Sequence, residues 1–386
     1  MIFLSNNNIR DSSNKINILS VKNSKDLKNF YKFPFQLYKN NPFWIPTFWK
    51  EFKDFFNKKN PFWTHSEYEL FIAEKISKIV GRIAAIIDNK YCETVGKKIG
   101  YFGFFECIDD FECAEALFNS AQNWLKSKNM KIIRGPIDGR VDINLGFLLS
   151  GFDKPASILS SYTPEYYISF AERFNMKKIR DFISYYIDLT KPFPEILKEN
   201  VQKSIDFGIK IRPFNRLYAN KELKWWTQLF LETFKDQWGF VPVSTKEVKS
   251  RFGVKQIRWF VDPKLFLVAE FKGSPIAYLW STPEYNQLFK NFNGRLGPFQ
   301  LIQILISKKQ INKGKLHFIG IKKEFRNKNI ASYLNYEALV EMKQRGYIGA
   351  EVGFIDEQNA VAHSTIVKTG AKRYKKFRVF EKIINT

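Results

Sequence analysis

The residues best suited to chemistry lie in one basic turn of the C-terminal half. An apolar run rich in β-formers, 316–321, leads into Lys-Lys-Glu-Phe-Arg-Asn-Lys-Asn at 322–329, and an apolar-periodic segment follows at once. The apolar positions of that segment recur at helical spacing: Ile330, Leu334, Ala338 and Met342. The first turn of a helix carries unpaired backbone N–H groups at the positive end of the helix dipole. This order of strand, basic turn and helix start therefore predicts a phosphate-binding site, although an ordinary lysine-rich βα turn explains the loop alone equally well.

The turn resembles motif A of the GNAT superfamily, the Gcn5-related N-acetyltransferases, whose loop reads Gln/Arg-x-x-Gly-x-Gly/Ala. Arg326 and Ala331 match the outer positions, and Asn329 stands where the central glycine is expected. Asparagine tolerates glycine-like backbone angles, so the loop shape is expected to survive. The resemblance implies an acyl-CoA co-substrate, acetyl-CoA or a longer one. The contacts expected for it are Ile319, Ile321, Arg326, Asn327, Lys328, Asn329, Ile330, Ala331, Ser332 and Asn359.

A second segment resembles motif B of the same superfamily. A short strand, 351–355, precedes Asn359, and Gly370 follows 11 residues later, where it suits a left-handed helix end. In many family members a tyrosine seven residues after the asparagine protonates the leaving thiolate. That position is Ile366, which cannot donate a proton. The candidates for a replacement acid are Tyr374, Ser364 and His363, of which Tyr374 is the first to test.

The resemblance also implies that the motif A and motif B strands splay apart around the acyl donor. The amine must lose a proton before it attacks, so a histidine or carboxylate near the gap is expected. His317 and Glu351 lie on these two strands and are the candidate bases. Strict alternation places Leu316, Phe318 and Gly320 on one face and His317, Ile319 and Ile321 on the other. Both faces are apolar, so alternation leaves open whether His317 points into the gap or packs.

Composition excludes several classes of protein. With 386 residues, 45% of them hydrophobic, the chain is long enough for two packed domains. Three cysteines without a CxxC pair and three histidines give no zinc ligand set, so no metal is expected. The N-terminus lacks the basic and apolar regions of a signal peptide, and no run approaches the ~20 apolar residues of a membrane span. We therefore expect a cytoplasmic protein with reduced cysteines.

The chain is strongly basic, with 62 Lys+Arg against 38 Asp+Glu and a net charge of +24. Such a charge attracts nucleic acid, anionic membranes or a polyanionic cofactor. The lysines are spread along the whole chain without a compact arginine block, which favours a solvated basic surface over nucleic acid or membrane as partner. The oligomeric state cannot be inferred from the sequence.

The order of elements predicts an α+β fold of two GNAT-like domains in tandem, 1–190 and 191–386. Each is expected to be a mixed, mainly antiparallel sheet flanked by helices, with a linker at Pro192–Pro194. In the first half we expect strands at 70–74, 78–88, 99–107, 131–135 and 178–189 and helices at 110–128 and 164–175. In the second half we expect strands at 209–214, 265–271, 275–282, 316–321, 351–355 and 374–384. The expected helices there are 220–238, 245–261, 299–308 and those of motifs A and B.

The first half has lost the phosphate-binding turn. After its long aromatic strand the chain reads Cys107-Ile-Asp-Asp-Phe-Glu, and these carboxylates would repel a pyrophosphate. We therefore expect a degenerate first domain. A loop of mixed charge and amide groups, 139–144, follows its buried strand, and such loops often line sites. Arg140, Asp142 and Asn144 are the candidate substrate-binding residues.

Further segments resemble a family of bacterial proteins with two GNAT-like halves. They include Asn41-Pro-Phe-Trp-Ile-Pro46, Arg134-Gly-Pro136 and Trp238-Gly-Phe-Val-Pro242, and together they cover nearly the whole chain. The function this implies is acyl-CoA-dependent N-acyl transfer, directly, to a small-molecule or peptide amine. Two alternatives stay open. One is a tRNA-dependent aminoacyl transferase of the peptidoglycan-bridge type, and the other is a non-catalytic scaffold that binds acyl-CoA or a polyanion.

Overall fold

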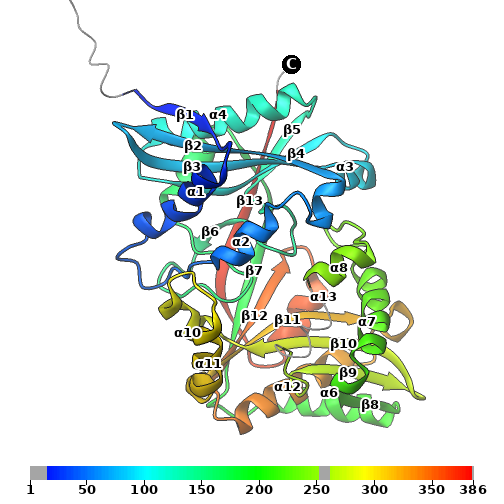
Figure 1. Ribbon diagram of the computed structural model, residues 1–386. Helices are drawn as coiled ribbons and strands as arrows, with labels where there is room; N and C mark the ends of the chain where they lie inside the picture. Colours follow the sequence, from blue (N-terminus) through cyan, green and yellow to red (C-terminus); the bar gives the residue numbers. More distant parts are fainter. Residues whose placement is uncertain (1–14, 252–260, 385–386) are drawn as a thin grey trace, which may run out of the picture.

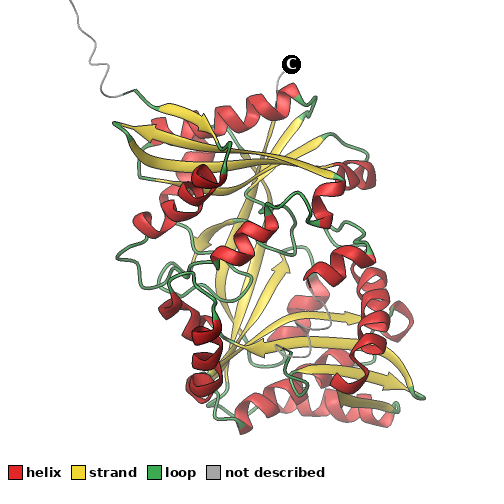
Figure 2. Cartoon of the chain, viewed as in Figure 1, coloured by secondary structure: helices red, strands yellow, loops and turns green. Residues whose placement is uncertain are grey.

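The structure is a computed structural model that describes residues 15–251 and 261–384. Figure 1 shows an upper and a lower lobe joined by long central strands, and Figure 2 shows helices packed on the sheet in both lobes. The described strands form one 13-stranded sheet in the order β1-β2-β3-β4-β5-β13-β7-β12-β11-β10-β9-β8, and β6 pairs with β13. The predicted α+β fold with a mixed sheet and flanking helices is confirmed.

The elements of each half have the following bounds. The first half contains β1 (Asn17–Ser20), α1 (Ser24–Leu37), α2 (Trp49–Phe55), β2 (Ser66–Lys75), β3 (Lys78–Asp88), α3 (Asn89–Val95), β4 (Ile99–Cys107), α4 (Phe111–Ser127), β5 (Ile132–Gly135), β6 (Phe147–Ser150), α5 (Tyr166–Arg173) and β7 (Lys177–Asp188). The second half contains α6 (Glu195–Asp206), β8 (Ile209–Pro213), α7 (Ala219–Phe234), α8 (Thr245–Arg251), β9 (Phe266–Phe271), β10 (Ser274–Pro283), α10 (Asn286–Phe289), α11 (Pro298–Ser307), β11 (Lys313–Ile321), α12 (Ile330–Gln344), β12 (Gly349–Asp356), α13 (Ala360–Val367) and β13 (Lys372–Ile383).

The predicted order of elements is confirmed in both halves. In each half a helix follows the fourth strand: α4 comes after β4, and α12 comes after β11. Sequence patterns gave no element at β1, α1, α2, α3, β6, α6 or α10. The helix expected at 220–238 ends at Phe234. Of the helix expected at 245–261, the part up to Arg251 is observed as α8, and 252–260 lie outside the described residues.

The two halves exchange strands at the centre of the sheet. The C-terminal strand β13 lies between β5 and β7 of the first half, with Phe380 opposite Gly135 and Phe377 opposite Phe182. β7 pairs with β13 along one edge and with β12 along the other, where Ile187 lies opposite Ala350. The division into 1–190 and 191–386 stays a prediction, because strands from before residue 190 pair with strands from after it.

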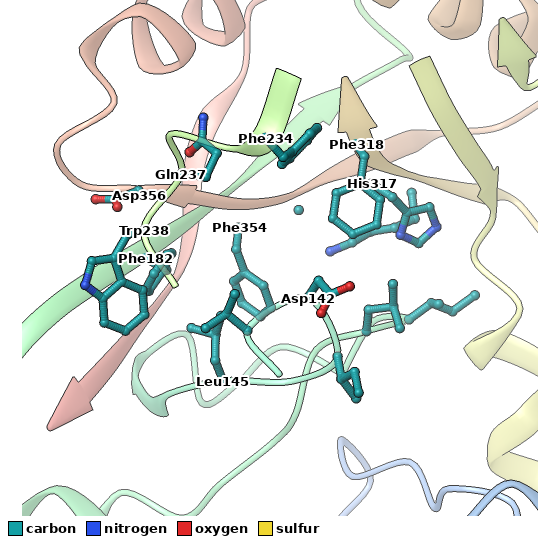
Figure 3. A pocket seen from close by; sticks show the side chains of 16 residues that line it. Asp142, Leu145, Phe182, Phe234, Gln237, Trp238, His317, Phe318, Phe354 and Asp356 are labelled. Atoms are coloured by element: carbon teal, nitrogen blue, oxygen red, sulfur yellow. The ribbon is translucent and has the colours of Figure 1, made fainter. Parts of the chain in front are cut away.

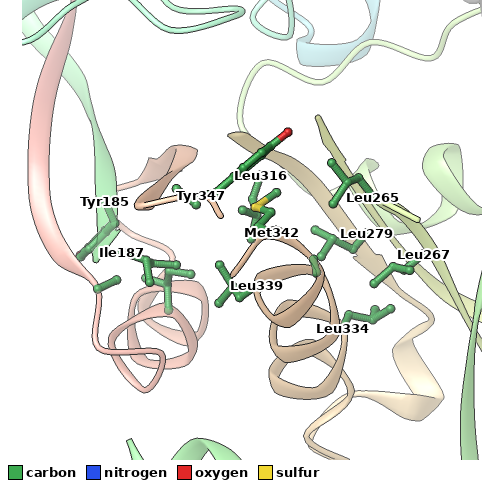
Figure 4. Close-up of a cluster of buried hydrophobic side chains, with 14 of the residues drawn as sticks. Tyr185, Ile187, Leu265, Leu267, Leu279, Leu316, Leu334, Leu339, Met342 and Tyr347 are labelled. Carbon is green, nitrogen blue, oxygen red and sulfur yellow. The ribbon is translucent and has the colours of Figure 1, made fainter. Parts of the chain in front are cut away.

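The largest apolar core of the second half forms around α12. Its predicted apolar face is confirmed, since Ile330, Leu334, Ala338 and Met342 are each at most 1% exposed. Figure 4 shows Leu339 and Met342 of α12 between Ile187 of β7 on one side and Leu267 of β9 and Leu279 of β10 on the other. Ile187 of β7 belongs to this same core. A strand from the first half therefore completes the core that positions the basic turn.

Candidate active site

A gap opens between the parallel strands β11 and β12. Pairing runs from Lys313 opposite Gly349 to Leu316 opposite Val352, and within the described residues it goes no further. The break expected between these strands is confirmed. It leaves the backbone edge of β11 at 317–321 facing the gap. An extended ligand can hydrogen-bond to such an edge as an added strand would.

A β-bulge at His317 shapes the start of this edge. Opposite β10, Trp280 pairs with Phe318 and Ser281 pairs with Leu316, so His317 is an extra residue in β11. Strict alternation was therefore wrong here, because a bulge shifts the side chains on one side of it by one position. Leu316 belongs to the same core as Ile319 and Ile321, not to the face of Phe318.

The basic turn has the backbone geometry of an anion site. Asn327 and Asn329 adopt left-handed conformations, with φ of 64° and 56°, so the expected glycine-like angle at Asn329 is confirmed. Among the described residues no hydrogen-bond acceptor is recorded for the backbone amides from Asn327 to Ser332, and Tyr333 is the first to bond, to the Asn329 carbonyl. α12 then runs for 15 residues. These free amides at a helix start fit a pyrophosphate.

The side chains in and around the turn differ in exposure. Arg326 and Lys328 are exposed, and the Lys328 ammonium lies 4.6 Å from the Phe207 ring centroid. Ile330 and Ser332 are buried, so only their backbone amides can face a ligand. Ile319 and Ile321 likewise pack their side chains on the core and offer only backbone to the gap.

The motif B helix starts and ends as predicted. Asn359 caps α13, since its side-chain oxygen accepts the Ala362 amide at 3.0 Å, and Gly370 has a φ of +84° beyond the helix. Ile366 is 3% exposed and packs in the core around α12, so a core side chain fills the usual position of the acid. On the same helix, His363 Nδ1 lies 2.7 Å from the Tyr185 hydroxyl.

A pocket of about 120 Å³ lies where the gap meets the first half. Its walls come from the 141–159 segment, β7, the end of α7, β11 and β12 (Figure 3). The lining residues are Val141, Asp142, Ile143, Leu145, Ile158, Leu159, Phe182, Phe234, Gln237, Trp238, Lys315, His317, Phe318, Gly353, Phe354 and Asp356. Figure 3 shows the Asp142 carboxylate pointing into the space below His317 and Phe318. Such a volume holds several waters or a small polar group.

His317 is a neutral imidazole in this pocket. Burial, and then the positive charge of Lys315, lower the pKa of His317 to about 3. Its Nε2 atom hydrogen-bonds with the Thr282 hydroxyl at 2.8 Å, and its ring lies 4.7 Å from Trp280. The bulge thus brings His317 to the pocket, but its low pKa makes it a weak base.

A buried charge cluster lies beside the pocket. Lys315 Nζ donates to Glu351 Oε1 at 3.1 Å and to the Ser157 hydroxyl at 2.8 Å, while Lys375 Nζ donates to Glu351 Oε2 at 3.0 Å and to the Pro155 carbonyl at 2.7 Å. Burial opposes ionisation of Glu351, but the two lysines outweigh it and lower the pKa of its carboxyl to about 2. The geometry gives Glu351 the role of counter-charge for two lysines, and its role as a base stays a prediction.

Glu284 and Tyr374 lie next to this cluster. Burial raises the pKa of Glu284 to about 7, and its carboxylate accepts the Ile158 amide at 3.3 Å. Burial, together with Glu351, raises the pKa of Tyr374, whose ring centroid lies 5.1 Å from that of Tyr186. Neither Tyr374 nor Glu351 is among the lining residues of the pocket. The acid role of Tyr374 stays a prediction.

The three candidate residues of the 139–144 loop have different surroundings. Asp142 lines the pocket opposite His317. Arg140 is 7% exposed and holds the loop in place, donating to Asp142 at 2.9 Å and lying 3.6 Å from Glu247. Asn144 donates to Asp138 at 2.7 Å. Arg140 and Asn144 thus position the loop, and the expected contact of all three side chains with the substrate stays a prediction.

Sequence reasoning missed the buried lysines and part of the pocket wall. Lys315 precedes the apolar run of β11, a weak signal for buried charge, whereas Lys375 lies among other basic residues, and their shared partner Glu351 is distant in the sequence. No motif marks Phe182 or Asp356 as site residues. Within the described residues no group of three or more histidine, cysteine or acidic side chains is arranged for a metal ion.

Comparisons with known proteins agree with the fold. The model of the acetyltransferase (GNAT) family matches residues 225–370. Over 372 residues the chain is 30% identical to Protein YghO of Escherichia coli (strain K12), covering 94% of each chain. Over 383 residues it is 28% identical to a protein of Caulobacter vibrioides named bacterial ceramide synthase, covering 97% of this chain and 99% of that one. A tandem GNAT protein from the clavulanic acid biosynthesis pathway superposes with a TM-score of 0.58 at 10% identity, covering 96% and 99% of the two chains.

Proposed function

Because this chain belongs to the GNAT family of acyltransferases, with YghO and the Caulobacter ceramide synthase as full-length relatives, we propose that it transfers an acyl group from acyl-CoA to a primary amine. The observation that carries the proposal is the row of free backbone amides from Asn327 to Ser332 beside the unpaired edge of β11. The pyrophosphate binds these amides, the pantetheine arm follows the strand edge at 317–321, and the thioester reaches the bulge.

The reaction needs few protein groups. The neutral amine attacks the thioester carbon, a C–N bond forms, the C–S bond breaks, and CoA leaves as its thiolate. The proton that the amine loses goes to a base or to water, and the thiolate takes up a proton in turn. A thiol has a pKa near ~8.5, so its thiolate leaves without strong acid help. The buried Ile366 at the usual acid position is compatible with this chemistry.

The pocket favours an amine on an apolar body. Asp142 supplies a carboxylate for an ammonium group, while Ile158, Leu159, Phe182 and Phe354 supply apolar walls. One full-length relative is named a ceramide synthase, and ceramide is the N-acyl derivative of a long-chain amino alcohol. We therefore propose a long-chain amino alcohol as acceptor and an acetyl or longer acyl-CoA as donor. Since acyl-CoA is made in the cytoplasm, the proposal places the protein there.

The donor site is tested by replacing Ala331→Asp. Ala331 is half-buried in the first turn of α12, and a carboxylate there would face the pyrophosphate. We expect CoA affinity, measured by calorimetry, to fall at least about a hundredfold through charge repulsion. The control is Ala116→Asp, the same change at a half-buried position of α4, the corresponding helix of the first half. Unchanged affinity in the Ala331 variant, or an equal loss in the control, would contradict the site.

The acceptor is tested by turnover. Release of CoA thiol and formation of the N-acyl product are followed by mass spectrometry with a long-chain amino alcohol, a short amine and a lysine peptide. We expect the long-chain amino alcohol to give the highest kcat/KM. Equal turnover of the short amine would overturn the acceptor and leave the donor site intact. CoA binding without turnover of any amine would favour a non-catalytic scaffold.

A further inference from the structure

Helix α11 presents an apolar surface to the outside of the molecule. Five of its ten residues are exposed large apolar side chains, which we call the α11 surface: Phe299 (71% exposed), Leu301 (40%), Ile302 (56%), Leu305 (76%) and Ile306 (74%). Among the described residues they make up five of the 17 exposed large hydrophobic side chains. At about 100° per residue they occupy an arc of roughly 160°. Such a contiguous exposed patch marks a contact surface.

The segment that carries α11 is anchored at both ends, so the exposure is not fraying. It leaves the sheet after β10 and returns at β11, next to the two strands of the site (Figure 1). Phe289 packs 4.9 Å from Phe48, and the Gly294 carbonyl accepts the Trp49 amide at 2.9 Å. At the base, Gln287 donates to Asn312 at 2.8 Å. Of the helix itself, Ile304 packs against the core that the described residues form around α12.

The charges around the α11 surface have one sign. From residue 285 to 323 the chain contains no aspartate or glutamate. Lys290 and Arg295 precede the helix, Lys308 and Lys309 follow it directly, and all four are exposed. An apolar helix face with basic flanks binds in the plane of an anionic membrane, where each Lys or Arg near the surface adds to the attraction. The net charge of +24 acts in the same direction and opposes contact with a second copy of this chain.

We propose that the α11 surface docks this protein onto anionic phospholipid membranes. The helix of ten residues is about 15 Å long, which is too short to cross a bilayer, so it lies within the headgroup region. None of the helices that the structure describes is long and apolar enough for a membrane span. The docking does not depend on the identity of the acyl acceptor. It revises the expectation from charge alone, which favoured a solvated surface.

The test is co-sedimentation with two kinds of vesicle, pure phosphatidylcholine and an equal mixture of phosphatidylcholine and phosphatidylglycerol. We expect the wild-type protein to pellet with the mixed vesicles only. Changing Leu305→Glu and Ile306→Glu together should weaken this binding at least about tenfold, since it removes apolar area and adds negative charge. Changing Lys308→Glu and Lys309→Glu should also weaken it. The matched control changes Ile76→Glu and Leu217→Glu, two apolar residues that are 66% and 86% exposed elsewhere, and should bind like the wild type.

Circular dichroism of each variant confirms that it is folded. Equal binding to both vesicles, no binding by the wild type, or an equal loss in the control would overturn the proposal. Sedimentation velocity tests whether a second copy of this chain binds the α11 surface instead. A dimer of the wild type that the Leu305/Ile306 variant abolishes, with no vesicle binding, would assign the α11 surface to self-association and also overturn the proposal.

Discussion

Replacing Glu351→Gln is expected to destabilise the fold by about 3–5 kcal/mol at neutral pH. Glu351 is the carboxylate between Lys315 and Lys375, whose side chains are 2% and 1% exposed. Glutamine keeps the shape but offers one acceptor, and its amide N–H₂ group would face the other ammonium. Two buried cations would then lack the counter-charge that now lies 3.1 Å and 3.0 Å away.

Two independent arguments lead to this magnitude. A carboxyl whose pKa falls from 4.5 to about 2 gains about 3 kcal/mol of favourable interaction in its ionised form. In the variant, one way to relieve the two buried charges is for a lysine to lose its proton. For a free lysine, with a pKa of about 10.4, this costs about 4.6 kcal/mol at pH 7, and burial, which lowers the pKa of Lys375, reduces the cost. The second figure is an upper limit, because the fold can also relax or admit water.

The assay is urea unfolding, followed in parallel by tryptophan fluorescence and circular dichroism to test for a single transition. The control is Asp54→Asn, which breaks the exposed Lys50–Asp54 pair at 2.7 Å and should cost less than about 1 kcal/mol. Changing Glu351→Gln and Lys375→Met together should recover about 2 kcal/mol relative to the sum of the single changes. If Glu351→Gln lowers the free energy of unfolding no more than the control does, the buried ion pairs of Glu351 contribute no more to stability than an exposed pair.

The pH dependence supplies the refuting result. The folded pKa of Glu351 is lowered, so its contribution is fully present above about pH 4.5 and is lost as the pH falls towards 2. The stability difference between wild type and Glu351→Gln should therefore shrink from about pH 5 to about pH 3. A difference that is constant over this range would mean that the ionised carboxylate is not the stabilising group.

Two further predictions concern catalysis. Burial and Lys315 hold the pKa of His317 at about 3, so the pH profile of kcat/KM should show no inflection near ~6.5 that His317→Gln removes; such an inflection would contradict the neutral, weakly basic imidazole. Ile366→Tyr should lower the free energy of unfolding by about 1–3 kcal/mol without a gain in rate, because the 3%-exposed side chain lies in a packed core. A faster enzyme of unchanged stability would show instead that a tyrosine at this position can reach the thiolate.

Local patterns predicted what short-range physics decides. The apolar face of α12, the left-handed Asn329 and the Asn359 cap each depend on a few neighbouring residues, and each is confirmed. Alternation along β11 failed at His317, because a bulge depends on the partner strand as much as on β11 itself. The contact of both Lys315 and Lys375 with Glu351 could not be predicted from local patterns. It depends on the strand order β13-β7-β12-β11, which brings three segments distant in the sequence together.

The start of α4 shows why the first half has no phosphate site of its own. At the start of α4, the Asp110 carboxylate accepts the amides of Glu112 and Cys113 at 3.0 and 3.4 Å and pairs with Lys75. The helix start that could have bound a phosphate is thus occupied by the chain itself, whereas the corresponding amides of α12 stay free.

The first half instead supplies pocket walls. Phe182 comes from β7, a strand that pairs with β12 of the second half, and Asp142 comes from the loop that Arg140 holds against Glu247. Under the proposed function, donor binding resides in the second half, and acceptor choice resides largely in the first. Divergence of the 139–159 segment could then change the amine without disturbing the backbone amides that bind CoA. Retaining a degenerate half is therefore consistent with a role in acceptor selection, carried by the segment that lies across the gap from the thioester.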